Sequence, residues 1–233
     1  MDSLRPYLGL AIYPAAFLLG FAVNPVEFSW SFRLARQRRP LDDSMPAEVR
    51  NKADEVNRYL NFLVDGLILL FSTILLRGTA LGPARVGLQL ANWERNAVIG
   101  IATGTLLVLT QSLVVRQVPV DPQHPFTYQV QRGCPALWVL IFITGAFSQE
   151  LWIALCLVVF LATGHSAAVA IAATVVVFAA MHYSYRFWGA LAVAITAAIS
   201  ALLFLQFRSL VVTFLYHFVG NIGSLYWNRY WRR

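Results

Sequence analysis

Residues 135–163 read PALWVLIFITGAFSQELWIALCLVVFLAT, a long run that is almost entirely apolar or small but carries the pair Gln149-Glu150 near its middle. About 20 apolar residues are enough to cross the hydrocarbon core of a bilayer. An ionisable side chain at the bilayer centre costs about 2.5 to 3.5 kcal/mol on insertion scales, so such residues usually line a functional cavity. This stretch therefore predicts a membrane-spanning helix with a polar site inside it.

The composition of the whole chain agrees with a membrane protein. Of its 233 residues, 58% are hydrophobic and 12% are charged, which is more apolar surface than a soluble domain of this size can bury. The net charge is +7, and the basic residues lie mostly outside the apolar runs, as membrane flanks do, so we expect no nucleic-acid partner. The two cysteines, Cys134 and Cys156, show neither metal-ligand spacing nor a disulfide framework.

Seven apolar segments of membrane length are predicted, or eight if the segment 135–163 is broken in two. The other six cover residues 7–23, 59–76, 97–115, 166–184, 187–206 and 209–227. We therefore expect an all-α, polytopic membrane helical bundle that forms one structural domain. Its parts are N-terminal helices with a basic loop (1–134, loop 29–58), core helices (135–227) and a short basic tail (228–233).

Basic residues predict the orientation of these segments. Most of the 18 Lys and Arg residues fall in alternate loops and in the C-terminal tail, and the loop 29–58 is the richest in them. By the positive-inside rule, the N-terminus is then outside and the C-terminus is cytoplasmic. No organelle-targeting signal is evident, so we expect an integral protein of a bacterial plasma membrane.

Two later segments carry paired side chains four residues apart. Phe178 precedes His182, and His217 precedes Asn221. Residues at this spacing lie on the same helix face, so each pair can line a shared cavity. Together with Glu150 they provide a carboxylate, two imidazoles and an amide, and such a set can activate a water molecule or stabilise an oxyanion.

The same side chains make a weaker case for a metal site. Glu150, His182 and His217 would be the ligands of a divalent ion such as Zn²⁺. The His-Glu-x-x-His spacing of soluble zinc proteases is absent from the sequence. We therefore expect no required cofactor and keep Zn²⁺ as the alternative.

In order and spacing, these motifs resemble those of the CPBP intramembrane proteases, the family of CAAX proteases and bacteriocin-processing enzymes that is also called Abi. The resemblance covers roughly residues 135–227 and includes the sequence Phe-Arg-Ser-Leu that begins at Phe207. It implies an endopeptidase in which His182 helps a carboxylate to activate water, while His217 and Asn221 hold the oxyanion. The implied partners are the lipid bilayer and a peptide or protein substrate, lipidated in some cases.

The first motif of that family, Glu-Glu-x-x-x-Arg, is altered in this chain. Gln149 stands at the first glutamate, Glu150 at the second and Ala154 at the arginine. Because an amide cannot take a proton from water, we expect Glu150 to be the working carboxylate, alone or through Gln149. Neighbours on a helix point about 100° apart, so this role requires the helix to rotate, kink or unwind. Arg186, one turn beyond His182, is expected to supply the missing positive charge.

Other interpretations remain open. The two histidines can be hydrogen-bonding groups between helices, and Glu150 can be a structural carboxyl. Asp65 lies on one helix face with Asn61 and is expected to stabilise the bundle or to support the site. Phe178 is likewise expected to support the site or contact the substrate. The chain can also be a catalytically inactive relative that binds a peptide or a lipidated segment, as in bacteriocin immunity. A third alternative is a proton-coupled transporter that uses Asp65, Glu150 and the histidines as a relay.

Overall fold

The computed structural model describes residues 65–70, 72–73, 82–117, 135–182 and 186–230. The secondary structure among these residues is helical, which confirms the all-α class. The first predicted span, the basic loop 29–58, Asn61 and the last three residues of the tail lie outside the described part. The number of seven spans therefore stays a prediction.

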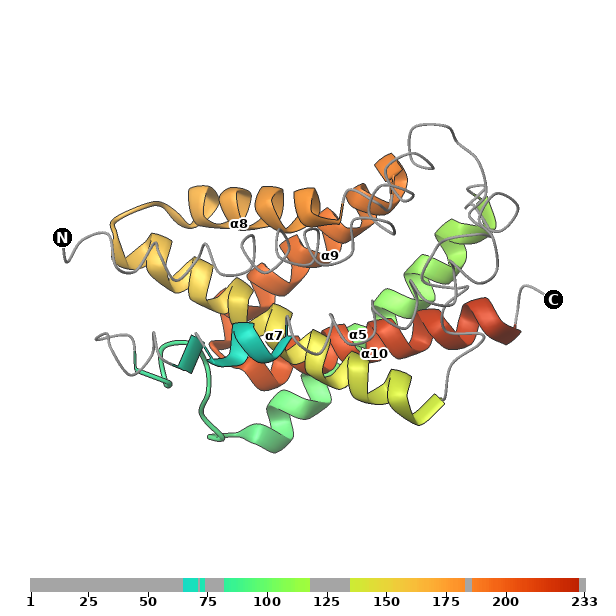
Figure 1. Cartoon of the computed structure of the whole chain (residues 1–233), viewed down its shortest axis with the longest axis horizontal. Helices are drawn as coiled ribbons and strands as arrows, with labels where there is room; N and C mark the ends of the chain where they lie inside the picture. The colour runs from blue at the N-terminus through green and yellow to red at the C-terminus, as the bar shows by residue number, and fades with distance from the viewer. Residues whose placement is uncertain (1–64, 71, 74–81, 118–134, 183–185, 231–233) are drawn as a thin grey trace.

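Five long helices form the described bundle, and a short helical stretch at residues 65–70 and 72–73 precedes them (Figure 1). They are α5 (Trp93–Gln117), α7 (Pro135–Ala162), α8 (Ala167–Met181), α9 (Arg186–Phe207) and α10 (Leu210–Tyr230). Each begins and ends within a few residues of an apolar segment predicted above. Since α7 is one continuous helix, the alternative in which this segment breaks into two is wrong.

Two of the described helical segments, Val139–Ala162 and Gly189–Phe207, are long and apolar enough to cross a membrane. The apolar helices Ala167–Met181 and Leu210–Gly223 are shorter. Large apolar side chains of α5 point outward with more than half of their surface exposed, among them Leu106, Leu109 and Leu113. An exposed apolar surface of this kind suits contact with lipid.

α7 is the central helix of the described bundle. It contacts α8, α9 and α10 (Figure 1), and every residue from Glu150 to Val159 is buried. A helix that is apolar on all sides is stable where protein surrounds it, as α7 is over this stretch. Its middle therefore lies in the core, and the polar side chains it carries there must find partners inside the protein.

The connections at one end of the bundle contact one another. The Leu210 N–H donates to the Gly87 carbonyl oxygen at 3.1 Å. Gly87 has a φ of +76°, and a Cβ there would lie 2.7 Å from the Leu210 nitrogen, so only glycine allows this approach. Leu161, near the end of α7, lines the same cavity as Arg85 and Arg208. Three alternate connections thus meet at one end, as antiparallel helices require, and the membrane face that this end occupies stays a prediction.

Two glycines allow α5 to pack closely against α10. A Cβ on Gly100 would lie 2.6 Å from the carbonyl oxygen of Val212, and a Cβ on Gly104 would lie 2.8 Å from that of Tyr216. At these separations the backbones themselves are in contact, which is common where small residues recur every four positions in membrane helices. This contact holds α10, and with it His217, in a fixed position.

We predict that Gly104→Ala lowers the stability of the protein by about 1–3 kcal/mol, because the added methyl group must displace the backbone of α10. Thermal unfolding in detergent, followed by circular dichroism, will show a lower Tm. Gly66→Ala is the matched control, since a Cβ at Gly66 meets no described atom within 4 Å. Equal Tm values for the two variants would contradict the close packing of α5 on α10.

Candidate active site

The carboxylate of Glu150 joins three helices inside the bundle. Its Oε1 accepts a hydrogen bond of 2.7 Å from Nδ1 of His217 on α10. Its Oε2 accepts a hydrogen bond from the hydroxyl of Ser200 on α9. Glu150, Ser200 and His217 are only 2%, 1% and 9% exposed. A single side chain of α7 thus binds both α9 and α10 in a place that water does not reach.

The partners of Glu150 account for its position in the core. A buried carboxylate is costly unless hydrogen bonds satisfy its oxygens, and here both oxygens have a partner. Ala154, at the position of the family arginine, is fully buried in close-packed core. In this chain the hydrogen bonds from Ser200 and His217, and not an arginine at position 154, satisfy the Glu150 carboxylate. The side chain of Arg186 lies outside the described part, so its predicted charge-compensating role stays a prediction.

The hydrogen bond to Glu150 fixes the orientation of the His217 ring. A carboxylate oxygen only accepts, so Nδ1 of His217 carries a proton. The opposite nitrogen, Nε2, is then turned away from Glu150, with a lone pair in the neutral ring and a second proton in the charged ring. Asn221 is half-buried one turn later on α10. The spacing of His217 and Asn221 on one helix face is retained in the structure.

His182 is the residue that ends α8, as its C-cap. Its Nδ1 lies 2.8 Å from the carbonyl oxygen of Phe178, so this nitrogen donates and carries the ring proton. The His182 ring also packs on the Phe178 ring with 4.7 Å between centroids, and Phe178 stacks on Trp152 of α7 at 6.2 Å. This aromatic stack ties His182 to α7.

Gln149 has different surroundings from Glu150. The amide nitrogen of Gln149 and the Oδ2 atom of Asp65 lie 3.9 Å and 3.6 Å from the point where a Cβ on Gly145 would be. Asp65 is buried, and its Oδ1 accepts a hydrogen bond of 2.6 Å from the hydroxyl of Ser148. Since α7 is continuous through this region, the predicted break or unwinding that would let Glu150 replace Gln149 does not occur.

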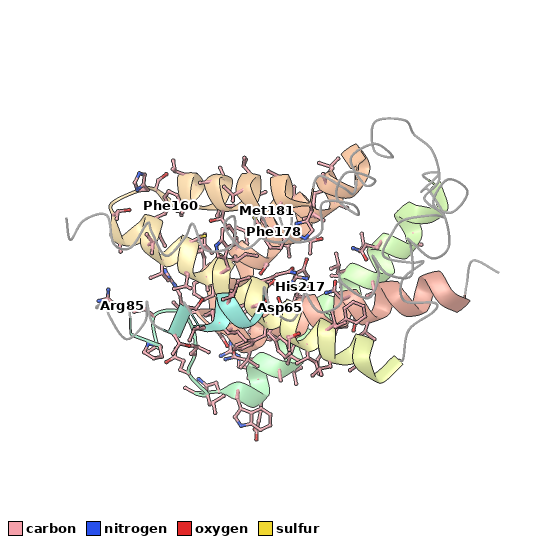
Figure 2. The ribbon with its side chains drawn as sticks, in the orientation of Figure 1. Asp65, Arg85, Phe160, Phe178, Met181 and His217 are labelled. Carbon is pink, nitrogen blue, oxygen red and sulfur yellow. The ribbon has the colours of Figure 1, made fainter. Side chains whose placement is uncertain are left out.

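Figure 2 shows how the labelled side chains are distributed. Asp65 and His217 lie near the middle of the bundle, and Phe178 and Met181 lie on the side of α8. Arg85 lies at the end of the bundle where α7 ends. The buried polar groups are therefore set well inside the protein, away from the exposed arginines.

Ser148 and Ser200 contact these carboxylates but were not among the predicted site residues. Their signal in the sequence is a hydroxyl within an apolar segment. Serine is also a common small packing residue in membrane helices, so the sequence alone does not distinguish the two uses. The structure shows how each helix is oriented about its own axis, and in that orientation both serines donate to carboxylates.

The predicted zinc ligands do not form a ligand set. Among the residues that the structure describes, no three His, Cys, Asp or Glu side chains are gathered as metal ligands. Both oxygens of Glu150 and Nδ1 of His182 are engaged in other hydrogen bonds. The arrangement does not fit a zinc ion held by Glu150, His182 and His217. Independence from a cofactor stays a prediction.

We predict that His217→Ala lowers stability by about 3–5 kcal/mol, because it leaves a buried carboxylate without its ring partner. Ser200→Ala removes a neutral hydroxyl and should cost about 1–3 kcal/mol. Unfolding by heat in detergent measures both. His165→Ala changes an exposed histidine in the turn after α7 and serves as the control. If His217→Ala unfolds at the same temperature as His165→Ala, the Glu150–His217 contact does not hold the bundle together.

Comparison with protein-family models matches residues 131–223 to the type II CAAX prenyl endopeptidase Rce1-like family. The matched segment runs from just before α7 into α10 and contains Gln149, Glu150, both motif histidines and Asn221. No curated protein and no solved structure matched the chain. The resemblance predicted from the three motifs is therefore confirmed, since residues 131–223 match the model of the Rce1-like type II CAAX prenyl endopeptidase family.

Proposed function

We propose that this protein is an intramembrane endopeptidase of the CAAX-protease type. Its substrate is a peptide or protein, lipidated in some cases, and its reaction is hydrolysis of a peptide bond. The observation that carries the proposal is the buried hydrogen bond between Glu150 and His217, which lies inside the segment that matches the family. A carboxylate that accepts a hydrogen bond from Nδ1 orients an imidazole so that its other nitrogen, Nε2, can face a reacting group.

In the proposed mechanism, His217 and Asn221 stabilise the oxyanion of the tetrahedral intermediate. When protonated, Nε2 of His217 donates a hydrogen bond to the developing negative charge. The amide of Asn221, one turn away on the same face of α10, supplies a second donor. Fixed donors of this kind act where charge develops in the transition state, and this effect is commonly the largest one in acyl transfer.

We assign to Glu150 the orientation of His217 and not direct contact with the attacking water. Its Oε1 is bound to His217, its Oε2 to Ser200, and the side chain is 2% exposed. A group that takes a proton from water must be within hydrogen-bonding reach of that water. Glu150 therefore acts through His217, and His182 is the proposed partner of the water itself.

We place the reaction inside the bilayer of a bacterial plasma membrane, near its cytoplasmic face. The helical segments Val139–Ala162 and Gly189–Phe207 support the membrane location, because both are long and apolar enough to cross. The excess of basic residues in alternate loops and in the tail supports the cytoplasmic side for the end of α8, where His182 lies.

A second candidate is a catalytically inactive relative that binds a peptide or a lipidated segment. Gln149 favours it, since an amide stands where the family motif has its first glutamate and cannot accept a proton. In that case the Glu150–His217 contact serves the fold alone. Cleavage by the unmodified protein distinguishes the two candidates.

We predict that the purified protein in detergent cleaves members of a library of membrane-anchored and CAAX-like peptides. Asn221→Ala should lower kcat by about 10²–10³-fold with little change in KM, because it removes an oxyanion donor. Mass spectrometry of the products over time gives both constants. Asn96→Ala, at the other end of the bundle, is the matched control and should keep the parental rate.

Two results would contradict the proposed function. If the parent protein binds peptides from the library but cleaves none of them, it is an inactive relative. If it cleaves none and instead supports pH-driven uptake into vesicles, it is a transporter.

A further inference from the structure

One face of α7 is built to meet the helix of Asp65 on one side and α8 on the other. The residues of this α7 stripe are three or four positions apart and so lie on one face. They are Gly145, Ser148, Gln149, Trp152 and Cys156. Glu150 lies outside the stripe and points to α9 and α10. The two neighbouring residues of the first motif therefore serve different faces of α7.

The contacts between α7 and α8 show which residues of α8 the stripe faces. Trp152 stacks on Phe178 with 6.2 Å between the ring centroids. The helices are antiparallel, so a step of one turn toward the end of α8 corresponds to one turn back along α7. That step places His182 at the level of Ser148. The hydroxyl of Ser148 donates to Asp65. By this register, the end of α8 at His182 lies at the same level along α7 as Asp65.

The Asp65 carboxylate and the Gln149 amide both lie beside Gly145. Oδ2 of Asp65 is 3.6 Å from the position that a Cβ on Gly145 would take, and the amide nitrogen of Gln149 is 3.9 Å from the same point. The Ser148 hydroxyl donates to Oδ1 of Asp65. A carboxylate has about four acceptor positions, so Asp65 can accept hydrogen bonds beyond the one from Ser148.

We propose that Asp65 supplies the catalytic carboxylate that the family motif places at position 149. The carboxylate comes from a different helix, but it lies beside the same Gly145 as the Gln149 amide and accepts from Ser148 on α7. Asp65 and His182 then hold the attacking water between them. This inference rests on the proposed function, since it names the base of that same hydrolysis.

The proposed step balances in atoms and charge. The water oxygen attacks the carbonyl carbon of the substrate, and one water proton passes to the Asp65 carboxylate. The carbonyl oxygen becomes the oxyanion held by His217 and Asn221. The carbon–nitrogen bond then breaks, and the leaving nitrogen takes the proton from Asp65, with the His182 ring as the neighbouring hydrogen-bonding group. The products are a carboxylic acid and an amine, and Asp65 is a carboxylate again.

The test replaces the carboxylate and then returns it from the neighbouring side chain. Asp65→Asn keeps an oxygen that can accept from Ser148 but cannot take a proton. Its kcat should fall by about 10²-fold or more with KM little changed, the range for loss of a general base. Adding Gln149→Glu to Asp65→Asn should restore a large part of the lost rate. Ser72→Ala, a buried serine in the same short helical stretch, should keep the parental kcat.

Each outcome decides a different point. If Asp65→Asn cleaves as fast as the parent, the inference is overturned and the proposed function stands. If the parent is silent and Gln149→Glu alone awakens cleavage, Asp65 does not replace the motif glutamate, although the family chemistry survives. Silence of the parent and of Gln149→Glu together overturns the proposed function and this inference with it. If Asp65→Asn alone does not fold, the folded variant that combines Asp65→Asn with Gln149→Glu is measured instead. Its activity supports the inference, and its inactivity overturns it.

Discussion

The buried carboxylate of Glu150 is the interaction on which the rest of the site depends. It is bonded to His217 and Ser200, so it fixes α10 and α9 against α7 without contact with solvent. Removing water from a carboxylate is costly. The two hydrogen bonds offset that cost only while α7, α9 and α10 keep their orientation about their own axes. The same contact that stabilises the bundle therefore sets the direction in which the His217 ring points.

α7 uses the two residues of its altered motif on two different faces. Glu150 hydrogen-bonds His217 on α10, whereas the Gln149 amide and the Asp65 carboxylate both lie beside Gly145. Because adjacent residues on a helix diverge by about 100°, a carboxylate lost at one of them cannot be replaced by its neighbour. In the mechanism proposed above, the carboxylate comes from another helix, as Asp65, which is buried and accepts a hydrogen bond from Ser148 on this face of α7.

The apolar pattern predicted the described helices to within a few residues, because the length needed to cross a bilayer is a strong constraint. The motif residues Glu150, His182 and His217 were also predictable, since ionisable groups are rare in such segments. The pairing of Glu150 with Ser200 and His217 was not, because these residues are 50 and 67 positions away and meet only through the rotation of each helix. The expected break in α7 is wrong, because the helix is continuous here and both oxygens of Glu150 are hydrogen-bonded to side chains of other helices.

The most direct test of the account is the protonation of the His217 ring. Nitrogen-15 NMR of histidine-labelled protein in detergent or lipid, with the signal among the 4 histidines assigned through His217→Gln, reports which ring nitrogen carries hydrogen. We predict a proton on Nδ1 whose signal shifts in Glu150→Gln, because the Glu150 carboxylate accepts a hydrogen bond from that atom. A ring protonated on Nε2 alone, or a signal unchanged by Glu150→Gln, would contradict it.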